Sequence, residues 1–144
     1  MKIKPKKKTL SSVKKKLWDI FSVYIRMRDC LETTGSTEWG LCFSCDKRYH
    51  FKLLQAGHFI PGRHSANLFS ERGTHAQCYN CNINLKGNTL EYRRRIIAKY
   101  GQWADEELEA RARLIKKYTI PEIEGLIDYY NGEIKKLKER NKVS

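Results

Sequence analysis

Two Cys-x-x-Cys pairs constrain the fold of this 144-residue chain more than any other feature of its sequence. One pair is formed by Cys42 and Cys45, and the other by Cys78 and Cys81. Each pair offers two thiolates from one tight turn, and two such turns complete the tetrahedral sulfur shell that zinc prefers. We therefore predict one structural zinc ion held by all four cysteines, with no coordination position left open for chemistry.

The fifth cysteine and the amino-terminal segment indicate the cellular compartment and the role of the cysteines. Cys30 lies in an apolar helical pattern, which predicts buried packing rather than catalysis. The lysine-rich start of the chain has no apolar segment after it, so we expect no secretory signal. No apolar run is long enough to span a bilayer, and no membrane partner is expected. Paired cysteines in such a chain are expected to bind metal rather than to form disulfides.

The chain is strongly basic, with 29 Lys and Arg residues against 16 Asp and Glu residues and a formal net charge of +13. This excess favours a polyanionic partner, with nucleic acid as the first expectation and an anionic membrane surface as the second. Only 40% of the residues are hydrophobic. The core is therefore expected to be modest and to need a metal ion for stability.

The pattern along the chain predicts an α+β protein in which helices flank a small zinc-stapled core on both sides. Residues 1–9 form a basic tail, which either contacts phosphate groups or only aids solubility. Residues 10–101 are assigned to the zinc-stapled domain, and residues 102–144 to a helical extension.

The first predicted helix begins at a cap supplied by Ser11 or Ser12 and ends near Cys30, because apolar residues recur at helical spacing between them. After the first cysteine pair, residues 49–54 and 56–60 favour short strands. An irregular polar loop is then predicted over residues 61–77, and a loop of this length inside a compact domain is usually functional.

Three helices are predicted in the last third of the chain. The first begins with a capping box of Asn88 and Glu91 and ends at Gly101. The second covers residues 105–118, and the third begins at a Thr-Ile-Pro-Glu cap at Thr119. The apolar stripe of the third helix either packs against the core or forms the interface of a homodimer.

One histidine and one asparagine stand out beside the cysteine pairs. His58 lies inside the loop that a bound zinc ion would close, and Asn82 directly follows the second pair. A histidine flanked by apolar residues is usually a packed core residue. A short helical segment is predicted after Cys81 and ends at Gly87, so Asn82 lies at its start. A zinc ion that joins the two turns would bring the strand of His58 against this segment. We therefore expect the two side chains to share one small polar cleft.

The order of these motifs resembles that of HNH, or ββα-metal, endonucleases, and most closely that of the phage NinG/Rap family of recombination nucleases. The resembling segments are residues 24–30, Cys42-x-x-Cys45, residues 56–60, residues 77–82, Gly87–Asn88 and Tyr92. The resemblance implies a ββα-metal core and an endonuclease that acts on branched recombination DNA, such as D-loops and Holliday junctions. It also implies a location in the cytoplasm of the infected bacterial host.

The resemblance assigns roles to the two residues singled out above. His58 matches the general base, which must be neutral to accept a proton from water. Asn82 matches a ligand of the catalytic Mg²⁺ or Mn²⁺ ion, for which an amide oxygen is a suitable hard donor. Such an ion neutralises the phosphate and stabilises the leaving oxygen.

The chain departs from the HNH pattern at Gly57, where an Asp or His metal ligand often precedes the base. A second ligand must then come from elsewhere, and His64 is the first choice, with Glu71 and His75 as further candidates. The alternative role for His75 is to orient the base or to brace the loop. The alternative for Glu71, given equal weight, is a surface ion pair with Arg72 or Arg63.

Basic residues cluster in sequence around the expected cleft, where they are expected to bind DNA phosphates without reading sequence. They are Arg63, Arg72, Lys86, Arg93, Arg94 and Arg95. Each of them can equally belong to a solvated helix face.

Two other functions remain open at this point. One is a nuclease with a restriction or packaging role, which would cleave linear duplex. The other is a zinc-stapled DNA-binding accessory protein without catalysis, which the missing ligand at Gly57 favours. Symmetric cleavage of a junction would need two active sites, which makes a homodimer attractive.

Overall fold

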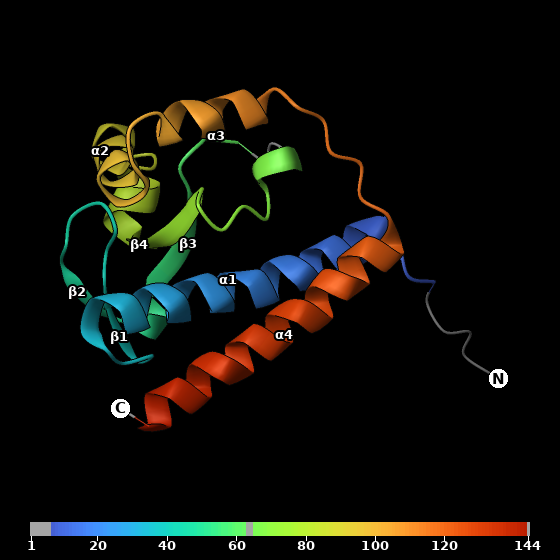
Figure 1. Cartoon of the computed structure of the whole chain (residues 1–144), viewed down its shortest axis with the longest axis horizontal. Coiled ribbons are helices and arrows are strands. Elements are labelled where there is room, and N and C mark those ends of the chain that lie inside the picture. The colour runs from blue at the N-terminus through green and yellow to red at the C-terminus, as the bar shows by residue number, and fades with distance from the viewer. Residues whose placement is uncertain (1–6, 63–64, 144) are drawn as a thin grey trace.

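The computed structural model describes residues 7–62 and 65–143 and has a mixed helix and sheet architecture, as predicted. Within these residues, four α-helices surround two small antiparallel sheets (Figure 1). The helices are α1 (Leu10–Thr34), α2 (Thr89–Tyr100), α3 (Ala104–Ala112) and α4 (Ile120–Val143). The strands are β1 (Trp39–Leu41), β2 (Arg48–His50), β3 (Leu54–His58) and β4 (Thr74–Cys78). No described helix is long and apolar enough to cross a membrane.

Helix α1 starts and ends outside its predicted limits. Its cap is Thr9, whose side chain accepts a hydrogen bond from the backbone N–H of Ser12 while the Ser12 hydroxyl accepts one from Thr9 N–H. The helix continues past Cys30 to Thr34 because nothing in the sequence stops it before Gly35. Gly35 has a φ of 78°, a left-handed conformation that favours glycine, and its N–H bonds to the Leu31 carbonyl.

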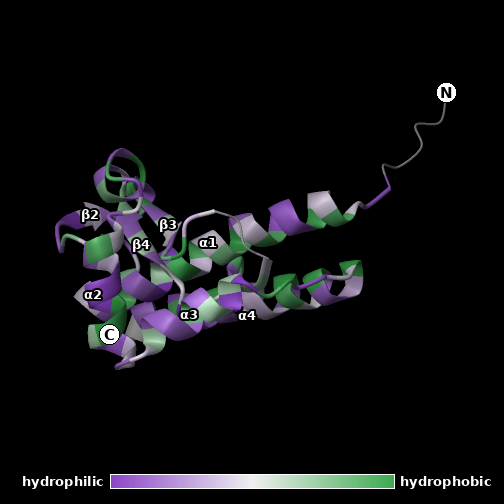
Figure 2. Ribbon diagram, turned by 90° about the horizontal axis from the view of Figure 1, so that it is seen from above, coloured by the Kyte–Doolittle hydropathy of each residue, from purple (hydrophilic) through white to green (hydrophobic). Residues whose placement is uncertain are grey.

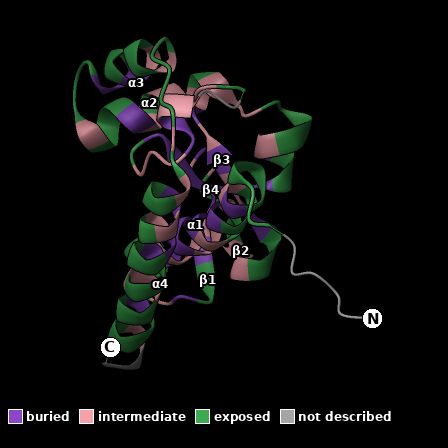
Figure 3. Ribbon diagram, turned by 90° about the vertical axis from the view of Figure 1, so that its right-hand side faces the viewer, coloured by how far each residue is buried: buried purple, intermediate pink, exposed green. Residues whose placement is uncertain are grey.

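Helices α1 and α4 lie side by side and run in the same direction (Figure 1). Hydrophobic and hydrophilic residues alternate along both helices (Figure 2), and the apolar side of α4 faces α1, which leaves its outer side exposed (Figure 3). The buried residues between them are Val13, Leu17, Phe21, Tyr24, Ile25, Ile123, Ile127, Tyr130 and Leu137. The apolar stripe of α4 is therefore core, and it is not available for a dimer interface.

The Thr119 cap predicted for α4 is confirmed, since its hydroxyl accepts a hydrogen bond from the backbone N–H of Glu122. Helix α3 is shorter than predicted and ends at Ala112, and the segment up to Thr119 is not helical. Helix α2 has its predicted range but not its predicted cap. Asn88 is left-handed, with a φ of 46°, and makes no side-chain hydrogen bond to the helix.

Both sheets are β-hairpins, and each of them positions cysteines of the cluster. Strand β1 pairs with β2 and carries the first cysteine pair in its connecting turn, and β3 pairs with β4. The predicted strand over residues 49–54 is wrong, because β2 ends at His50 and a short 3₁₀ turn, η1 (Phe51–Leu53), follows it. The predicted loop over residues 61–77 is also wrong at its end, where residues 74–77 belong to β4.

Strand β4 lies in the interior of the molecule, and all five of its residues are buried. In register, Gly57 pairs with His75, and Gln55 pairs with Gln77. The chain leaves β4 through a short π-helical turn, η3 (Asn80–Asn84), which holds the second cysteine of the second pair. Helices α2 and α3 then cover this sheet on the side away from α1 (Figure 1).

Candidate functional site

The four cysteines of the two pairs come together in one cluster. Their sulfur atoms all lie within 4.8 Å of one another, and they form the only such group of three or more potential ligands among the described residues. Cys42, Cys78 and Cys81 are buried, and Cys45 is partly exposed. This donor set fits one tetrahedral metal ion, and four thiolates favour zinc. The cluster supports the predicted structural metal site.

The thiols of the cluster differ: burial raises the pKa of Cys42 and Cys81, whereas hydrogen bonds favour the ionised form of Cys78. The backbone N–H of Cys81 donates to Cys78 Sγ over 3.4 Å, and Asn88 Nδ2 donates to Cys81 Sγ over 3.5 Å. Burial opposes ionisation of Cys78, but the Cys81 N–H and the Tyr49 hydroxyl outweigh it and lower the pKa of Cys78 to about 7. Because a metal binds the thiolate, Cys78 is prepared for ligation near neutral pH.

The cysteine cluster joins the first hairpin to β4. The backbone N–H of Phe43 donates to the Ala76 carbonyl over 2.8 Å, and Gln77 Nε2 donates to Ser44 Oγ over 2.8 Å. The position of η3, and with it that of Asn82, therefore depends on the same clamp.

His58 and Asn82 line one groove of about 340 Å³. His58 ends β3, whereas Asn82 lies in η3, so the β3–β4 hairpin and the clamp bring them together. The remaining lining residues are Phe59, Pro61, Gly62, Lys86, Gly87 and Thr89. The shared cleft that the sequence predicts is therefore present in the fold.

His58 is held in a defined orientation. Its Nε2 lies 3.0 Å from the carbonyl oxygen of Leu68, which can only accept a hydrogen bond. That contact places a proton on Nε2, and in neutral imidazole the proton-accepting nitrogen is then Nδ1. The ring also stacks on Trp18 of α1, with centroids 5.0 Å apart and an interplanar angle of 23°.

Asn82 directs its amide oxygen toward Gly57. Its Nδ2 donates to Gln55 Oε1 over 2.8 Å, so its Oδ1 points away from Gln55 and toward Gly57. A Cβ atom on Gly57 would lie 2.8 Å from Asn82 Oδ1 and would overlap Gln77 Oε1. Two amide oxygens thus come together beside Gly57, and Asn82, which carries one of them, lines the groove with His58.

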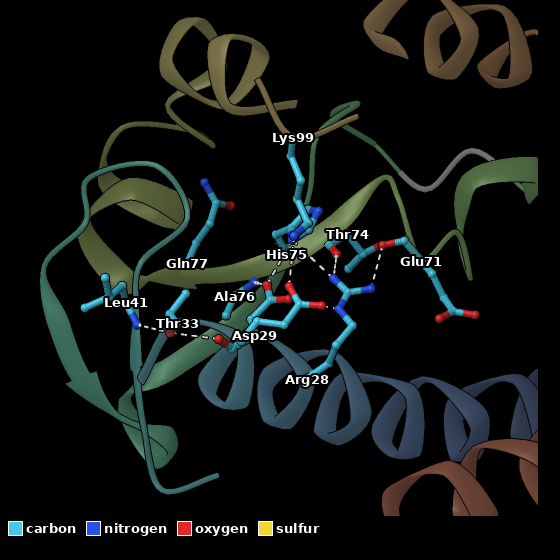
Figure 4. Close-up of polar contacts among 12 residues, drawn as sticks. Arg28, Asp29, Thr33, Leu41, Glu71, Thr74, His75, Ala76, Gln77 and Lys99 are labelled. Atoms are coloured by element: carbon cyan, nitrogen blue, oxygen red, sulfur yellow. Dashed lines mark hydrogen bonds and ion pairs between the residues drawn. The ribbon is translucent and has the colours of Figure 1, made fainter. Parts of the chain in front are cut away.

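His75 does not belong to this groove. It lies on β4 rather than in a loop and is 1% exposed, with its ring stacked on Phe43 at 3.8 Å. Its Nδ1 lies 3.0 Å from Asp29 Oδ2 (Figure 4), and its Nε2 lies 2.8 Å from the Tyr100 hydroxyl. The placement of His75 in a predicted loop is therefore wrong, and its contacts are those of a brace between α1, β4 and α2.

Asp29 is the centre of that brace (Figure 4). It accepts hydrogen bonds from Ala76 N–H over 2.7 Å and from Arg28 Nε over 2.9 Å, and Arg28 also donates to the Thr74 carbonyl. Burial opposes the charge on Asp29, but His75, Arg28 and the Ala76 N–H lower its pKa to about 2. Burial lowers the pKa of His75, although Asp29 opposes that effect.

The other predicted ligands lie elsewhere. Residues 63 and 64 are outside the described part of the chain, so Arg63 and His64 remain predictions. The Glu71 carboxylate accepts hydrogen bonds from the hydroxyls of Tyr24 and Tyr130, over 2.9 Å and 3.3 Å. It joins α1 to α4 and is not paired with Arg72 at the surface.

Only one described residue of the predicted basic cluster lines the groove, and that residue is Lys86. Arg93 contacts Asp105 and Glu109, and Arg94 contacts Glu91. Two further arginines are also engaged away from the groove. Arg95 contacts Asp46, and the guanidinium of Arg72 lies over the Tyr100 ring at 5.3 Å.

Sequence reasoning missed four residues that shape this region: Trp18, Asp29, Gln55 and Gln77. Trp18 and Asp29 lie on α1 and are joined to the sheet only by tertiary contacts, so no local pattern marks them. Gln77 had one signal, since it directly precedes Cys78 and shares a segment with Asn82.

Comparison with known proteins places this chain in a family. The family model described as "Bacteriophage Lambda NinG protein" matches residues 1–141. The chain is 33% identical over 98 residues to "Protein ninG" of Escherichia phage lambda, covering 67% of this chain and 47% of that protein. It is 31% identical over 99 residues to "Protein ninG" of Salmonella phage P22, covering 68% of this chain and 48% of that protein.

The chain thus spans about half the length of the curated relatives it matches. No solved structure matches it. Because the family model covers nearly the whole chain, the chain belongs to the NinG family of phage proteins.

Proposed function

We propose that this chain is a metal-dependent DNA endonuclease with an HNH-like, or ββα-metal, site. The observation that carries the proposal is the groove that His58 and Asn82 share beside a closed four-cysteine cluster. The order of elements also supports it, because the β3–β4 hairpin is followed directly by the η3 turn, as in a ββα unit. In this proposal the four-cysteine cluster binds a structural metal ion, and cleavage takes place in the groove.

His58 acts as the general base in this proposal. The Leu68 carbonyl holds the tautomer in which Nδ1 accepts a proton from the attacking water. The oxygen of that water bonds to phosphorus as the bond from phosphorus to the leaving sugar oxygen breaks. Stacking on Trp18 keeps the ring in place, so the imidazole is oriented before substrate arrives.

A divalent ion is required to balance the charge of the phosphate. Asn82 would hold it through Oδ1, which the Gln55 contact turns toward Gly57 and which is a hard donor suited to Mg²⁺ or Mn²⁺. When bound, the ion neutralises the phosphate and stabilises the leaving oxygen. The residues fit such an ion, since two amide oxygens converge there and no cationic side chain of the described residues contacts either of them.

Two sets of basic residues are proposed to hold the DNA strand. Lys86 lies in the groove itself. On the other side of the Trp18–His58 stack, a second hollow of about 420 Å³ is lined by Lys14, Lys15 and Trp18, among others. Lys15 and Lys16 form no ion pair within the described part of the chain, so their charges are available for phosphate.

Branched recombination DNA is the proposed substrate, and the basis for it is the resemblance to recombination nucleases together with membership of the NinG family. Phosphate and shape recognition suit this substrate, because phosphate contacts position a protein on DNA without reading its sequence. A non-catalytic DNA-binding role is the second candidate, and the specific observation in its favour is Gly57, which offers no side-chain ligand.

The test is a nicking assay with zinc-loaded protein on a four-way junction and on a linear duplex of the same sequence, with and without Mg²⁺ or Mn²⁺. Metal-dependent cleavage of the junction in preference to the duplex is expected. Preferential cleavage of the duplex would favour a restriction or packaging role. Tight binding of either DNA without cleavage under any metal condition would favour the accessory role.

A further inference from the structure

We propose that Gln77 supplies the second protein ligand of the catalytic divalent ion, in place of a side chain on Gly57. This inference rests on the proposed function and deepens it. Gln77 lies on β4, one strand away from Gly57, and is fully buried at 0% exposure. Its Oε1 atom has no hydrogen-bond partner among the described residues.

The orientation of the Gln77 amide is fixed by its own contacts. Its Nε2 donates to the Gly87 carbonyl over 2.9 Å and to Ser44 Oγ over 2.8 Å. A carbonyl oxygen cannot donate, so exchanging the amide nitrogen and oxygen would place two oxygens against each other at Gly87. Oε1 must therefore point away from Gly87, toward Gly57.

Gly57 leaves the space that this oxygen occupies. A Cβ atom there would overlap Gln77 Oε1 and would come within 2.8 Å of Asn82 Oδ1. Glycine is thus required at this position so that an oxygen from the neighbouring strand can reach it. The glycine that looked like a lost ligand in the sequence makes room for a ligand from β4.

A buried oxygen without a donor is costly, by about 1–3 kcal/mol. Two amide oxygens that converge without a hydrogen between them are a site for a hard cation, which accepts electron density from both. The alternative is that the Asn82 amide is turned so that its Nδ2 donates to Gln77 Oε1. In that arrangement Gln77 would be a structural acceptor and would not contact a metal.

The experiment measures Mn²⁺ binding to zinc-loaded protein, by loss of the electron paramagnetic resonance signal of free Mn²⁺, and does not depend on activity. Zinc content and melting temperature are measured for every variant. Gln77→Met keeps the length of the side chain but removes the oxygen, and Asn82→Ala removes the first ligand. Gln102→Met, at an exposed glutamine outside the groove, is the matched control.

We expect wild type and Gln102→Met to bind one Mn²⁺ ion alike, and Gln77→Met and Asn82→Ala to bind it at least ~10-fold more weakly with zinc retained. Gly57→Ala should show a similar loss, because the added Cβ displaces both oxygens.

Two outcomes would count against the proposal in different ways. Unchanged Mn²⁺ affinity in Gln77→Met, with weakened binding in Asn82→Ala, would overturn the role of Gln77 and leave the proposed nuclease site intact. Mn²⁺ binding that is absent in wild type, or unaffected by Asn82→Ala, would overturn both. If Gln77→Met loses zinc, Gly57→Ala decides instead, because its Cβ would displace Gln77 Oε1 while the Nε2 donor to Ser44 is kept. Unchanged Mn²⁺ affinity in Gly57→Ala would then overturn the role of Gln77.

Discussion

At the scale of single residues, Asp29 carries a buried charge that several hydrogen-bond partners hold in place. It lies on α1 and holds the backbone of β4 through Ala76 N–H, while Arg28 and His75 surround its carboxylate (Figure 4). Arg28 and Asp29 have side-chain exposures of only 12% and 6%. Because removal of one partner leaves the other charge buried and unpaired, this ion pair matters more for stability than the surface pairs do.

Asp29→Asn is therefore expected to lower the free energy of unfolding by about 3–5 kcal/mol, measured by chemical denaturation of zinc-loaded protein. Asp46→Asn is the matched control, since Asp46 pairs with Arg95 at the surface and is 58% exposed. Its cost should stay below about 1 kcal/mol. Equal effects of the two substitutions would show that the buried network does not carry the stability assigned to it.

At the scale of elements, two devices hold the fold together: the α1–α4 pair and the cysteine clamp. The helix pair buries one apolar cluster, with aromatic contacts such as Phe21 on Tyr130 at 5.0 Å. The clamp has little apolar area of its own, since the hairpin β1–β2 has only three residues in each strand. We therefore expect a metal ion bound by the four cysteines to add to the hydrogen bonds that hold this hairpin against β4.

Ile123→Ala tests the helix pair. Ile123 is 0% exposed and lies at the start of α4, so the substitution removes buried methyl groups and leaves a cavity. We expect a loss of about 2–5 kcal/mol in the free energy of unfolding. Ile115→Ala, at a residue that is 84% exposed, should change it by less than about 0.5 kcal/mol. A small effect at Ile123 would contradict the packing of α4 on α1.

Cys78→Ala tests the clamp against Cys30→Ala, which changes a buried cysteine outside the cluster. Elemental analysis should find one zinc per chain in wild type and in Cys30→Ala, and much less in Cys78→Ala. Removal of the metal from wild type with a chelator should lower the melting temperature, because a metal that binds only the folded chain stabilises it. Full zinc content in Cys78→Ala would contradict the four-cysteine site.

At the scale of the whole molecule, some basic side chains are paired with carboxylates and others are not, so they differ in their ability to bind phosphate. The net charge is +13, but Arg93, Arg94 and Arg95 on α2 are each paired with carboxylates. The lysines near the start of α1 border the hollow beside the Trp18–His58 stack. DNA is therefore expected to approach His58 along α1 rather than along α2.

The salt dependence of DNA binding distinguishes these two faces. The double variant Lys14→Ala, Lys15→Ala should reduce the slope of log affinity against log salt by up to about 2, since each lost phosphate contact lowers it by about 1. Arg93→Ala, whose guanidinium contacts Asp105 and Glu109, should leave the slope unchanged. Fluorescence anisotropy with a labelled junction measures both, and the reverse pattern would move the DNA path to α2.

The sequence predicts local features of this fold well, and the long-range ones poorly. The cysteine cluster, the α4 cap and the groove that His58 and Asn82 both line follow from spacing and capping rules. Strand β4 was hidden because both of its faces are buried, so it lacks the alternation that marks a half-exposed strand. The partners of Asp29 and Gln77 come from distant segments, and no local pattern encodes them.

The central claim is that His58 acts as the base of a nuclease, and it is tested most directly by single-turnover cleavage of a four-way junction. His58→Ala should reduce the rate by about 10²–10⁴-fold, with zinc content, melting temperature and DNA affinity retained. His50→Ala is the matched control, since His50 caps η1 and does not line the groove. Cleavage by folded, zinc-loaded His58→Ala at the wild-type rate would contradict the claim.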